Sequence, residues 1–450
     1  MRLKYIPLLM LLCILPLALD FKGDEDGGSA AQVALVIPVL LSGFLLALSG
    51  PRFRSASTLR SIASFAITLT VAGSIIPQFM QGNDPGNYLR VLLAFLLFML
   101  GFHIGCHPWA DARLVRFRSL LFMSMALSVI FTLLHGMVSG GPITDARFKI
   151  VSPMLLGFQG YLLYDIVTNR SATRIELAAF IVTLVIELLS VTRSFMLGTI
   201  LLFCVAIWLG SRSLSNLTMA LVRTSAIAGI LVIGVGVTAT IVAPNVMEKW
   251  SERIFAFEAT TNGKDPTTLS RLAEIEGQYD QVTSSAANFI FGMGLGHEYH
   301  FASKYFYDLI STQAFSADVL KRRSAWEAGH NFWVYQLYSG GVAFGIALPM
   351  AVLLAFIVCA FKYKRVRKMQ LKNEYIDSLG RYLLVTAGMI AETIGGNPLG
   401  PRYNGIIYGL AFGLMIAAYC QLSSRCIQAT VSPSAVSTFR RENAAIEMGR

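Results

Sequence analysis

The chain carries little charge for its length. Of its 450 residues, 14% are charged and 55% are hydrophobic, and the mean hydropathy is +0.60. A single soluble core cannot hide so much apolar surface from water, so these values exclude a soluble globular protein. Because a helix satisfies its own backbone polar groups in lipid, the sequence predicts an all-α, polytopic membrane protein.

Cysteine is absent from every segment that we expect to face an outer compartment. The cysteines fall in predicted spans or in the C-terminal tail: Cys13, Cys106, Cys204, Cys359, Cys420 and Cys426. An oxidising compartment would find none of them to pair, so no disulfide framework is expected. Internal repeats and low-complexity stretches are also lacking.

Long apolar runs are what the chain has in abundance. A helix needs about 20 residues to cross a bilayer, and twelve runs are predicted to do so, at about 3–19, 30–49, 61–79, 88–107, 119–138, 152–168, 175–192, 195–211, 224–243, 340–361, 376–394 and 405–422. Arg2 and Lys4 precede the first run, as in a signal peptide. The residues Leu17-Ala18-Leu19-Asp20 make a poor cleavage site, so we interpret this run as a span.

The net charge of +11 is distributed in alternate loops, which excludes a nucleic-acid partner as its explanation. The positive-inside rule places the basic loops and both termini in the cytoplasm. These loops hold Arg52, Arg54, Arg60, Arg113, Arg116, Arg118, Arg170, Arg174, Arg212, Arg223 and the cluster 362–372. The predicted organisation is membrane helices in 1–243, one large outer loop at 244–331, further membrane helices in 332–422 and a cytoplasmic tail at 423–450.

Two arginines are candidates for binding phosphate at the outer face. Only a short connection joins the seventh and eighth runs, so Arg193 is held at the membrane boundary. Arg271 belongs to a helix predicted at 268–284 in the outer loop. A guanidinium matches phosphate oxygens with two hydrogen bonds and stays charged when partly desolvated. The alternatives are a snorkelling arginine and a solvated helix charge, respectively.

Three alternating glycines follow in the outer loop, at Gly292, Gly294 and Gly296. They permit a tight turn and a close approach of backbone to a ligand. Their spacing matches neither nucleotide-binding fingerprint.

Histidines occur in three places with different interpretations. His297 and His300 suggest a metal pair, but the preceding glycines favour a loop. A second group, formed by His103, Cys106 and His107, could bind a metal or haem, or consist of interfacial side chains. His330 precedes an aromatic segment that re-enters the membrane, where an imidazole can act as a general base or serve as a cap.

Charged and polar residues at the predicted outer ends of the spans complete the candidate site. Arg90, Glu187 and Glu392 lie in the same predicted leaflet as Arg193, and Asn331 follows His330. Intramembrane charges are functional candidates by default, with snorkelling as the alternative.

In combination and order, these motifs resemble the bacterial O-antigen ligase and O-antigen polymerase superfamily. The resemblance covers residues 180–360 and rests on Thr192-Arg193-Ser194, Arg271, the Gly292/Gly294/Gly296 turn, His330-Asn331 and Gly340-Gly341-Val342-Ala343-Phe344-Gly345. It implies about twelve spans in a GT-C-like layout, with one large periplasmic loop. It also implies metal-independent, cofactor-free glycosyl transfer from an undecaprenyl-diphosphate-linked glycan in the bacterial inner membrane.

Carried over to matching positions, the resemblance implies that Arg193 and Arg271 bind the diphosphate and that His330 serves the acceptor hydroxyl. Phe195 and Tyr338-Ser339 depart from the family pattern, where glycine and an acidic residue are usual. Together with the extended loop, these departures favour a polymerase over a ligase that transfers finished glycan to lipid A core. A flippase and a chain-length regulator are the expected protein partners.

A transporter or flippase is the alternative of another class, since many spans with scattered charges suit it equally well. Transporters usually show repeats and broken helices that meet at mid-membrane. This sequence shows neither plainly, and its polar residues gather on one predicted side.

Overall fold

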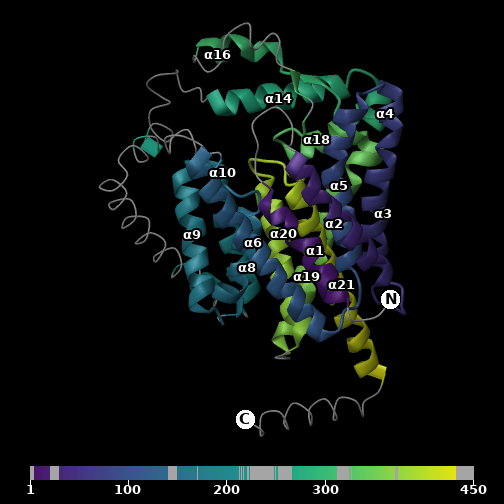
Figure 1. Cartoon of the computed structure of the whole chain (residues 1–450), viewed down its shortest axis with the longest axis vertical. Coiled ribbons are helices and arrows are strands. Elements are labelled where there is room, and N and C mark those ends of the chain that lie inside the picture. Colours follow the sequence, from purple (N-terminus) through teal and green to yellow (C-terminus); the bar gives the residue numbers. More distant parts are fainter. Residues whose placement is uncertain are drawn as a thin grey trace.

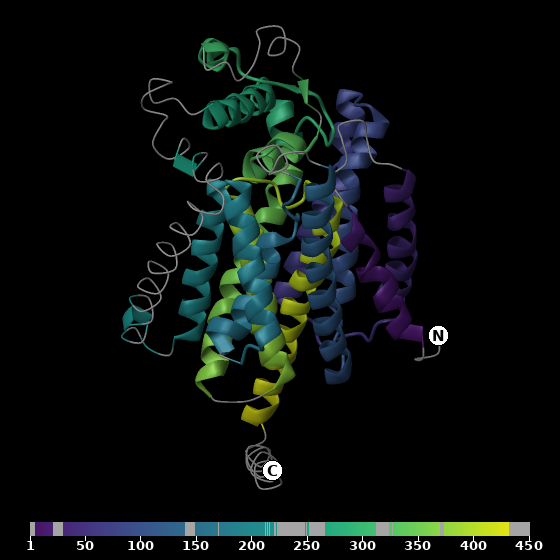
Figure 2. The same ribbon diagram turned by 60° about the vertical axis from the view of Figure 1, so that its left-hand side comes forward.

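A computed structural model shows a bundle of helices with a smaller helical cap at one end (Figure 1). It describes residues 5–20, 30–139, 149–169, 171–211, 266–311, 324–325, 327–369 and 373–431, with single residues between 213 and 251. The cap contains α14 (Pro266–Val282) and α16 (Phe306–Ser311), and a second view shows the same division into bundle and cap (Figure 2).

The described residues of the bundle are almost entirely helical. Its N-terminal elements are α1 (Ile6–Ile14), η2 (Pro16–Leu19), α2 (Ala30–Ser49), α3 (Thr58–Gly73), α4 (Ile75–Gln81), α5 (Pro85–Gly105) and α6 (Asp111–Ser139). The central elements are α8 (Leu155–Leu163), η3 (Tyr164–Asn169), α9 (Arg174–Ser190) and α10 (Arg193–Gly210). The C-terminal elements are α18 (Phe332–Gly340), η6 (Gly341–Gly345), α19 (Ala347–Lys368), α20 (Glu374–Glu392) and α21 (Arg402–Val431).

The helices confirm the class of protein that the composition predicts. Within the described residues, six helical stretches are long and apolar enough to cross a membrane: Thr58–Gln81, Pro85–Gly105, Asp111–Val138, Arg193–Gly210, Ala347–Lys368 and Arg402–Ser424. Two shorter apolar helices, Ile6–Leu19 and Ala34–Ser49, add to them. The number of twelve spans stays a prediction, and its run at 224–243 lies outside the described residues.

Helices α5 and α21 form the centre of the bundle, and glycines let their backbones touch. A Cβ atom built on Gly409 would overlap the carbonyl oxygen of Phe98, and one on Gly105 would overlap that of Leu410. Residues four apart lie on one helix face, so this glycine seam is continuous, formed by Gly101, Gly105, Gly405, Gly409 and Gly413. Small residues spaced in this way allow helices to pack closely in lipid.

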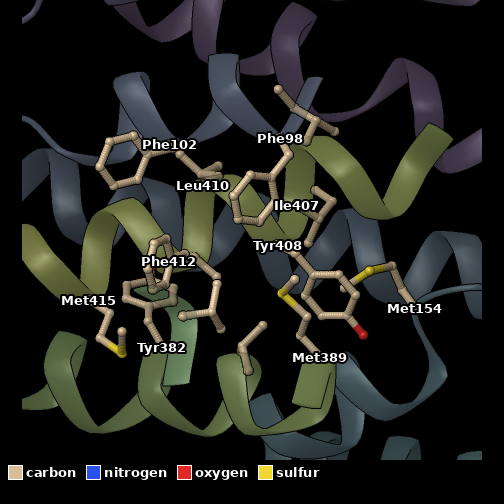
Figure 3. Packing of buried hydrophobic residues seen from close by; sticks show 14 of the residues in the cluster. Phe98, Phe102, Met154, Tyr382, Met389, Ile407, Tyr408, Leu410, Phe412 and Met415 are labelled. Atoms are coloured by element: carbon tan, nitrogen blue, oxygen red, sulfur yellow. The ribbon is translucent and has the colours of Figure 1, made fainter. Parts of the chain in front are cut away.

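Aromatic side chains fill the space beside the glycine seam (Figure 3). The ring of Phe412 lies 6.1 Å from that of Phe98 and 5.7 Å from that of Phe102, measured between centroids. Tyr408, from the same helix, extends toward Met154 and Met389 in Figure 3. The densest packing therefore involves helices that are far apart in the sequence.

Two predicted spans contain interruptions. The run expected at 61–79 divides into α3 and α4 at Ser74, three residues before Pro77. The run expected to begin at 340 is preceded by α18 and then by a π-helical turn, η6, in which Gly341 has φ +59°. Proline removes a backbone donor and glycine tolerates positive φ, so both breaks have local causes.

The cap is placed on the bundle by α14. This helix packs against α18, against the η5 turn (Ser303–Tyr305) and against β1 (Tyr299–His300), which pairs with β2 (Ser324–Ala325) in a two-stranded antiparallel ladder. The α15 helix (Ala286–Phe291) rests on η6. The cap therefore lies directly over the start of the aromatic α18 helix (Figure 1).

Candidate functional site

The imidazole of His330 is held by a carboxylate from the cap helix. Its Nδ1 lies 2.8 Å from Oε2 of Glu274, and its backbone N–H donates to Oε1 of the same carboxylate at 2.8 Å. The two carboxylate oxygens thus fix both the backbone and the ring of His330. A ring nitrogen that donates to a carboxylate leaves the other nitrogen with a lone pair.

The side chains of Glu274 and His330 differ sharply in their exposure to solvent. The side chain of Glu274 is 5% exposed, whereas that of His330 is 65% exposed. The imidazole therefore faces open space while its partner is packed inside the cap. A supported, accessible imidazole of this kind is what a general base requires.

The environment of Glu274 keeps its carboxylate ionised. Burial raises the pKa of Glu274, but the hydrogen bonds and charge of His330 and the hydrogen bond from Tyr299 outweigh it, so the pKa lies below its usual range. The Tyr299 hydroxyl donates to Oε1 at 3.1 Å. A Cβ atom on Gly329 would lie 2.6 Å from that oxygen, so a larger residue there would push the Glu274 carboxylate from its place.

Arg271 reaches the beginning of α10 from the same cap helix. Its Nη1 lies 3.2 Å from the position that a Cβ atom on Gly395 would occupy, and the side chain of Ser194 touches that position too. Gly395 belongs to the loop between α20 and α21. The cap arginine is therefore brought next to Ser194, the neighbour of Arg193 in the sequence.

Arg193 is the first residue of α10, and its side chain is half-buried. The helix follows a tight connection in which Val191 has φ +50°, and the indole N–H of Trp250 donates to the carbonyl of Leu188 at 2.9 Å. The N-terminus of a helix carries a partial positive charge. We call the first turn of α10, with Arg193, and the nearby Arg271 the positive corner, because both arginines and the helix N-terminus carry positive charge.

One helix connects the positive corner to the imidazole. Arg271 and Glu274 are three residues apart on α14, so they lie on the same face, one turn from each other. The Trp333 indole N–H, three residues beyond His330, donates to Thr393 at 3.2 Å, which ties α18 to the same loop as Gly395. The structure thus gathers Arg193, Arg271 and His330 at one end of the bundle.

The two predicted intramembrane carboxylates are hydrogen-bonded inside the bundle. Glu392, at the end of α20, accepts from Asn404 at 3.1 Å and from Tyr408 at 2.8 Å. It precedes Thr393 directly, which places its backbone beside the positive corner. Its side-chain contacts connect α20 to α21.

Glu187 lies deeper and belongs to a separate polar cluster. Its Oε2 accepts from Gln159 at 3.0 Å and from Thr199 at 2.9 Å, and Gln159 also donates to Thr183 at 3.3 Å. The Glu187 residue is 3% exposed. These contacts connect α8, α9 and α10 and give the carboxylate a clear packing role.

Arg90 lies on a different helix from the other candidates. It is exposed near the start of α5, whereas Arg193 and Arg271 lie on α10 and α14. The start of α5 contacts the glycine turn of the cap, since a Cβ atom on Gly296 would lie 2.6 Å from the carbonyl carbon of Asn87.

The turn formed by the three alternating glycines packs against the backbone at the end of α18. Gly292, Gly294 and Gly296 all have positive φ, and a Cβ atom on Gly292 would lie 2.6 Å from the Gly341 nitrogen. The N–H groups of Met293 and Gly294 donate to the carbonyls of Tyr338 and Ser339, respectively. These contacts lock the turn onto the end of α18, so we assign the glycines to packing rather than to direct substrate contact.

The two histidines that follow the glycine turn differ in their surroundings. Nδ1 of His297 lies 2.5 Å from Asn83 Oδ1, and burial lowers the pKa of His297. His300 lies in the short strand β1, where its side chain is exposed. Among the described residues, no group of three or more His, Cys, Asp or Glu side chains could hold a metal ion.

Asn331 is a helix cap, and Glu274 is the residue that sequence reasoning missed. The Asn331 side chain accepts from the Val334 N–H at 3.0 Å and so begins α18. Glu274 carried one usable signal, since it lies one helical turn from Arg271 in the predicted loop helix. Its pairing with His330, 56 residues away, depends on the tertiary fold.

No model of a known protein family matches the chain, and no curated protein sequence matches it significantly.

Proposed function

We propose that this protein is a membrane glycosyltransferase that acts at the outer face of the bacterial inner membrane on undecaprenyl-diphosphate-linked glycans. The observation that carries the proposal is the shared helix α14, which directs Arg271 to the positive corner and Glu274 to His330. Glycosyl transfer from a lipid diphosphate needs both features in proximity, a cationic grip on the leaving group and a base for the acceptor.

The reaction divides between these two features. An acceptor sugar hydroxyl attacks the anomeric carbon of the donor, and its proton passes to Nε2 of His330 as the new glycosidic bond forms. The bond between the anomeric carbon and the diphosphate oxygen breaks, and the released diphosphate gains negative charge. Arg193, Arg271 and the N-terminus of α10 stabilise this charge as it develops.

Glu274 acts through His330 rather than on substrate. It holds Nδ1 protonated and so directs the Nε2 lone pair outward, and its ionised carboxylate stabilises the imidazolium that forms during proton transfer. The 65% exposure of the imidazole leaves room for an acceptor sugar.

We favour a polymerase, which transfers the growing glycan onto an incoming lipid-linked repeat unit. The sequence departures at Phe195 and Tyr338-Ser339 support this choice over a ligase. Both reactions use the same diphosphate grip. Purified protein given only lipid-linked repeat units distinguishes them, because a polymerase lengthens these units without any lipid A acceptor.

The decisive experiment separates transfer from transport. In cells that rely on a plasmid copy of the protein, Arg193→Ala, Arg271→Ala and His330→Ala should each abolish polymer, while single repeat units still reach the outer leaflet. His300→Ala is the matched control, since it removes an exposed histidine of the same loop. Repeat units that accumulate on the inner leaflet would instead indicate a transporter.

A second arm tests the metal-free mechanism. Polymer formation by the purified protein should persist in excess chelator, because the arginines supply the charge that a divalent cation would otherwise supply. Loss of activity on chelation, restored by added magnesium, would contradict it.

A further inference from the structure

A pocket of about 650 Å³ lies between α3 and α5, at the end of the bundle away from α14. Figure 1 shows α3 extending from this end toward α4, which lies near the cap. The pocket is lined by the first turns of α3, the end of α5 and the residues that precede α3. Its lining consists of Arg52, Phe53, Arg60, Ser61, Ser64, Phe65, Thr68, Phe102, His103, Cys106 and His107.

The polar lining suits an anion. Arg52 and Arg60 supply two permanent charges, and among the described residues none of the lining side chains is acidic. Three hydroxyls on α3, from Ser61, Ser64 and Thr68, recur every three or four residues and so share one face. Arginines and hydroxyls together are the usual ligands of phosphate oxygens.

The start of α3 adds to this charge. Its N-cap, Ser57, makes no side-chain capping hydrogen bond, and the partial positive charge of the helix end lies one turn from Ser61. The pocket therefore combines fixed cations with a helix N-terminus.

The rest of the lining is aromatic and open to the side of the bundle. Phe65 is 68% exposed, and the guanidinium of Arg60 lies 4.5 Å from the ring centroid of Phe53. A small hydrated ion gains nothing from such surfaces. An amphiphile gains from both, because its head contacts the arginines and its chains contact the phenylalanines.

A metal ion fits the same residues poorly. His107 lies with Nδ1 2.9 Å from the Pro51 carbonyl and Nε2 3.1 Å from the Ala47 carbonyl, so backbone oxygens engage both ring nitrogens. A histidine ligand needs one nitrogen for the metal. Only His103 and Cys106 are left, too few for a site of three or four ligands.

We propose that this pocket binds the phosphate of an anionic phospholipid in the leaflet opposite the proposed reaction site. Basic pockets between membrane helices on the cytoplasmic side bind anionic headgroups in this way. The positive-inside expectation assigns this end to the cytoplasm, where such lipids meet the basic loops. The lipid would fix the position of α3 against α5 without entering the glycosyl-transfer reaction.

The test measures lipid binding by the purified, delipidated full chain. Native mass spectrometry or thermal-shift titration compares short-chain phosphatidylglycerol, phosphatidylcholine of the same chain length, and inorganic phosphate. Phosphatidylglycerol should bind tightest, and the double variant Arg52→Gln/Arg60→Gln should weaken its binding by about tenfold or more, since each charge-assisted contact to phosphate is strong.

The controls decide between a built pocket and general surface charge. Arg54→Gln removes an exposed arginine of the same loop that does not line the pocket, and it should leave phosphatidylglycerol binding unchanged. Ser64→Leu keeps every charge but fills the cavity, and it should abolish the preference for phosphatidylglycerol. Helical content by circular dichroism must match the wild type in each variant.

Three outcomes would overturn the proposal. Equal binding of phosphatidylcholine would show that the headgroup charge is not recognised. Equal binding of inorganic phosphate would identify a free anion as the ligand. Equal losses of binding in Arg54→Gln and in Arg52→Gln/Arg60→Gln would show that general surface charge, rather than the pocket, attracts the lipid.

Discussion

Glu274 shows how one buried residue fixes the position of an exposed one. Its carboxylate accepts two hydrogen bonds from His330 and one from Tyr299, while the imidazole stays accessible. Replacing it with glutamine preserves shape but removes the charge that would stabilise an imidazolium. The residue is therefore the sharpest single test of the proposed base.

Glu274→Gln should lower the rate of polymer formation by about 10- to 100-fold, the usual range for a residue that orients a catalytic group. His330→Ala should lower it by about 10²- to 10⁴-fold, the range for a lost general base. Initial rates with purified protein and lipid-linked repeat units measure both. Since Glu274 acts through His330, adding Glu274→Gln to His330→Ala should have little further effect; additive losses would contradict a shared pathway.

The same carboxylate predicts how cap stability depends on pH. Because the folded-state pKa of Glu274 is lower than its unfolded value, its contribution is complete above about pH 4.3, the ordinary glutamate value. It disappears as the pH falls through the lowered folded value. Wild type should exceed Glu274→Gln by about 1–3 kcal/mol in unfolding free energy at pH 7, and the difference should still be present at pH 5.5.

Thermal unfolding of the two proteins, followed by tryptophan fluorescence, measures that difference. It should shrink only in more acidic buffer, below about pH 4.3. A difference that already vanishes between pH 7 and pH 5.5 would assign the stabilisation to another group.

For single residues, the sequence predicted which side chains belong to the candidate site better than it predicted their contacts with one another. Arg193, Arg271 and His330 stood out because guanidinium groups suit phosphate and an imidazole suits proton transfer, and the structure gathers them at one end of the bundle. Glu274 had no such distinction among the acidic residues of a polar loop. The sequence could not tell what approaches the glycine turn, because glycine permits a positive φ whether a ligand or the protein's own backbone lies beside it.

At the scale of elements, the glycine seam between α5 and α21 fixes the centre of the bundle. Lipid provides no hydrophobic driving force between helices, so close backbone contact contributes much of their association. Gly409→Ala should lower the unfolding free energy by about 1–3 kcal/mol, because its methyl group would overlap the Phe98 carbonyl. Thermal stability of the purified protein in detergent measures the effect.

Gly210→Ala is the matched control for this prediction. A Cβ atom there would have its nearest neighbours at 3.4 Å, which is ordinary contact, so its stability should equal that of the wild type or exceed it slightly. Equal destabilisation by the two substitutions would show that helical glycine itself, rather than the seam, is responsible.

Sequence periodicity predicted most helices but not how they are interrupted. The cap helix expected at 268–284 is found at Pro266–Val282, because its polar and apolar residues alternate with helical period. The span expected from 340 is preceded by α18 and η6, since Gly340-Gly341 permits a π-turn that an apolar run conceals. The apolar content of a segment alone cannot show where the helix that it forms is interrupted.

For the whole molecule, the proposal needs the cap and the α3–α5 pocket on opposite sides of the membrane. The structure places them at opposite ends of the bundle (Figure 1), and the positive-inside rule assigns the cap to the outside. Single cysteines at the two ends test this assignment in intact cells. His300→Cys lies in the cap and Arg54→Cys in the loop before α3, and both positions are exposed.

A membrane-impermeant maleimide should label His300→Cys in intact cells and Arg54→Cys only after the membrane is opened. Within the described residues, four of the native cysteines are buried, and Cys204 is exposed on α10, a helix apolar enough to cross the membrane. Labelling of the wild-type chain measures the background. If only Arg54→Cys were labelled in intact cells, the topology would be the reverse of the one we expect. His330 would then face the cytoplasm, where no transfer on outward-facing lipid-linked glycan could occur.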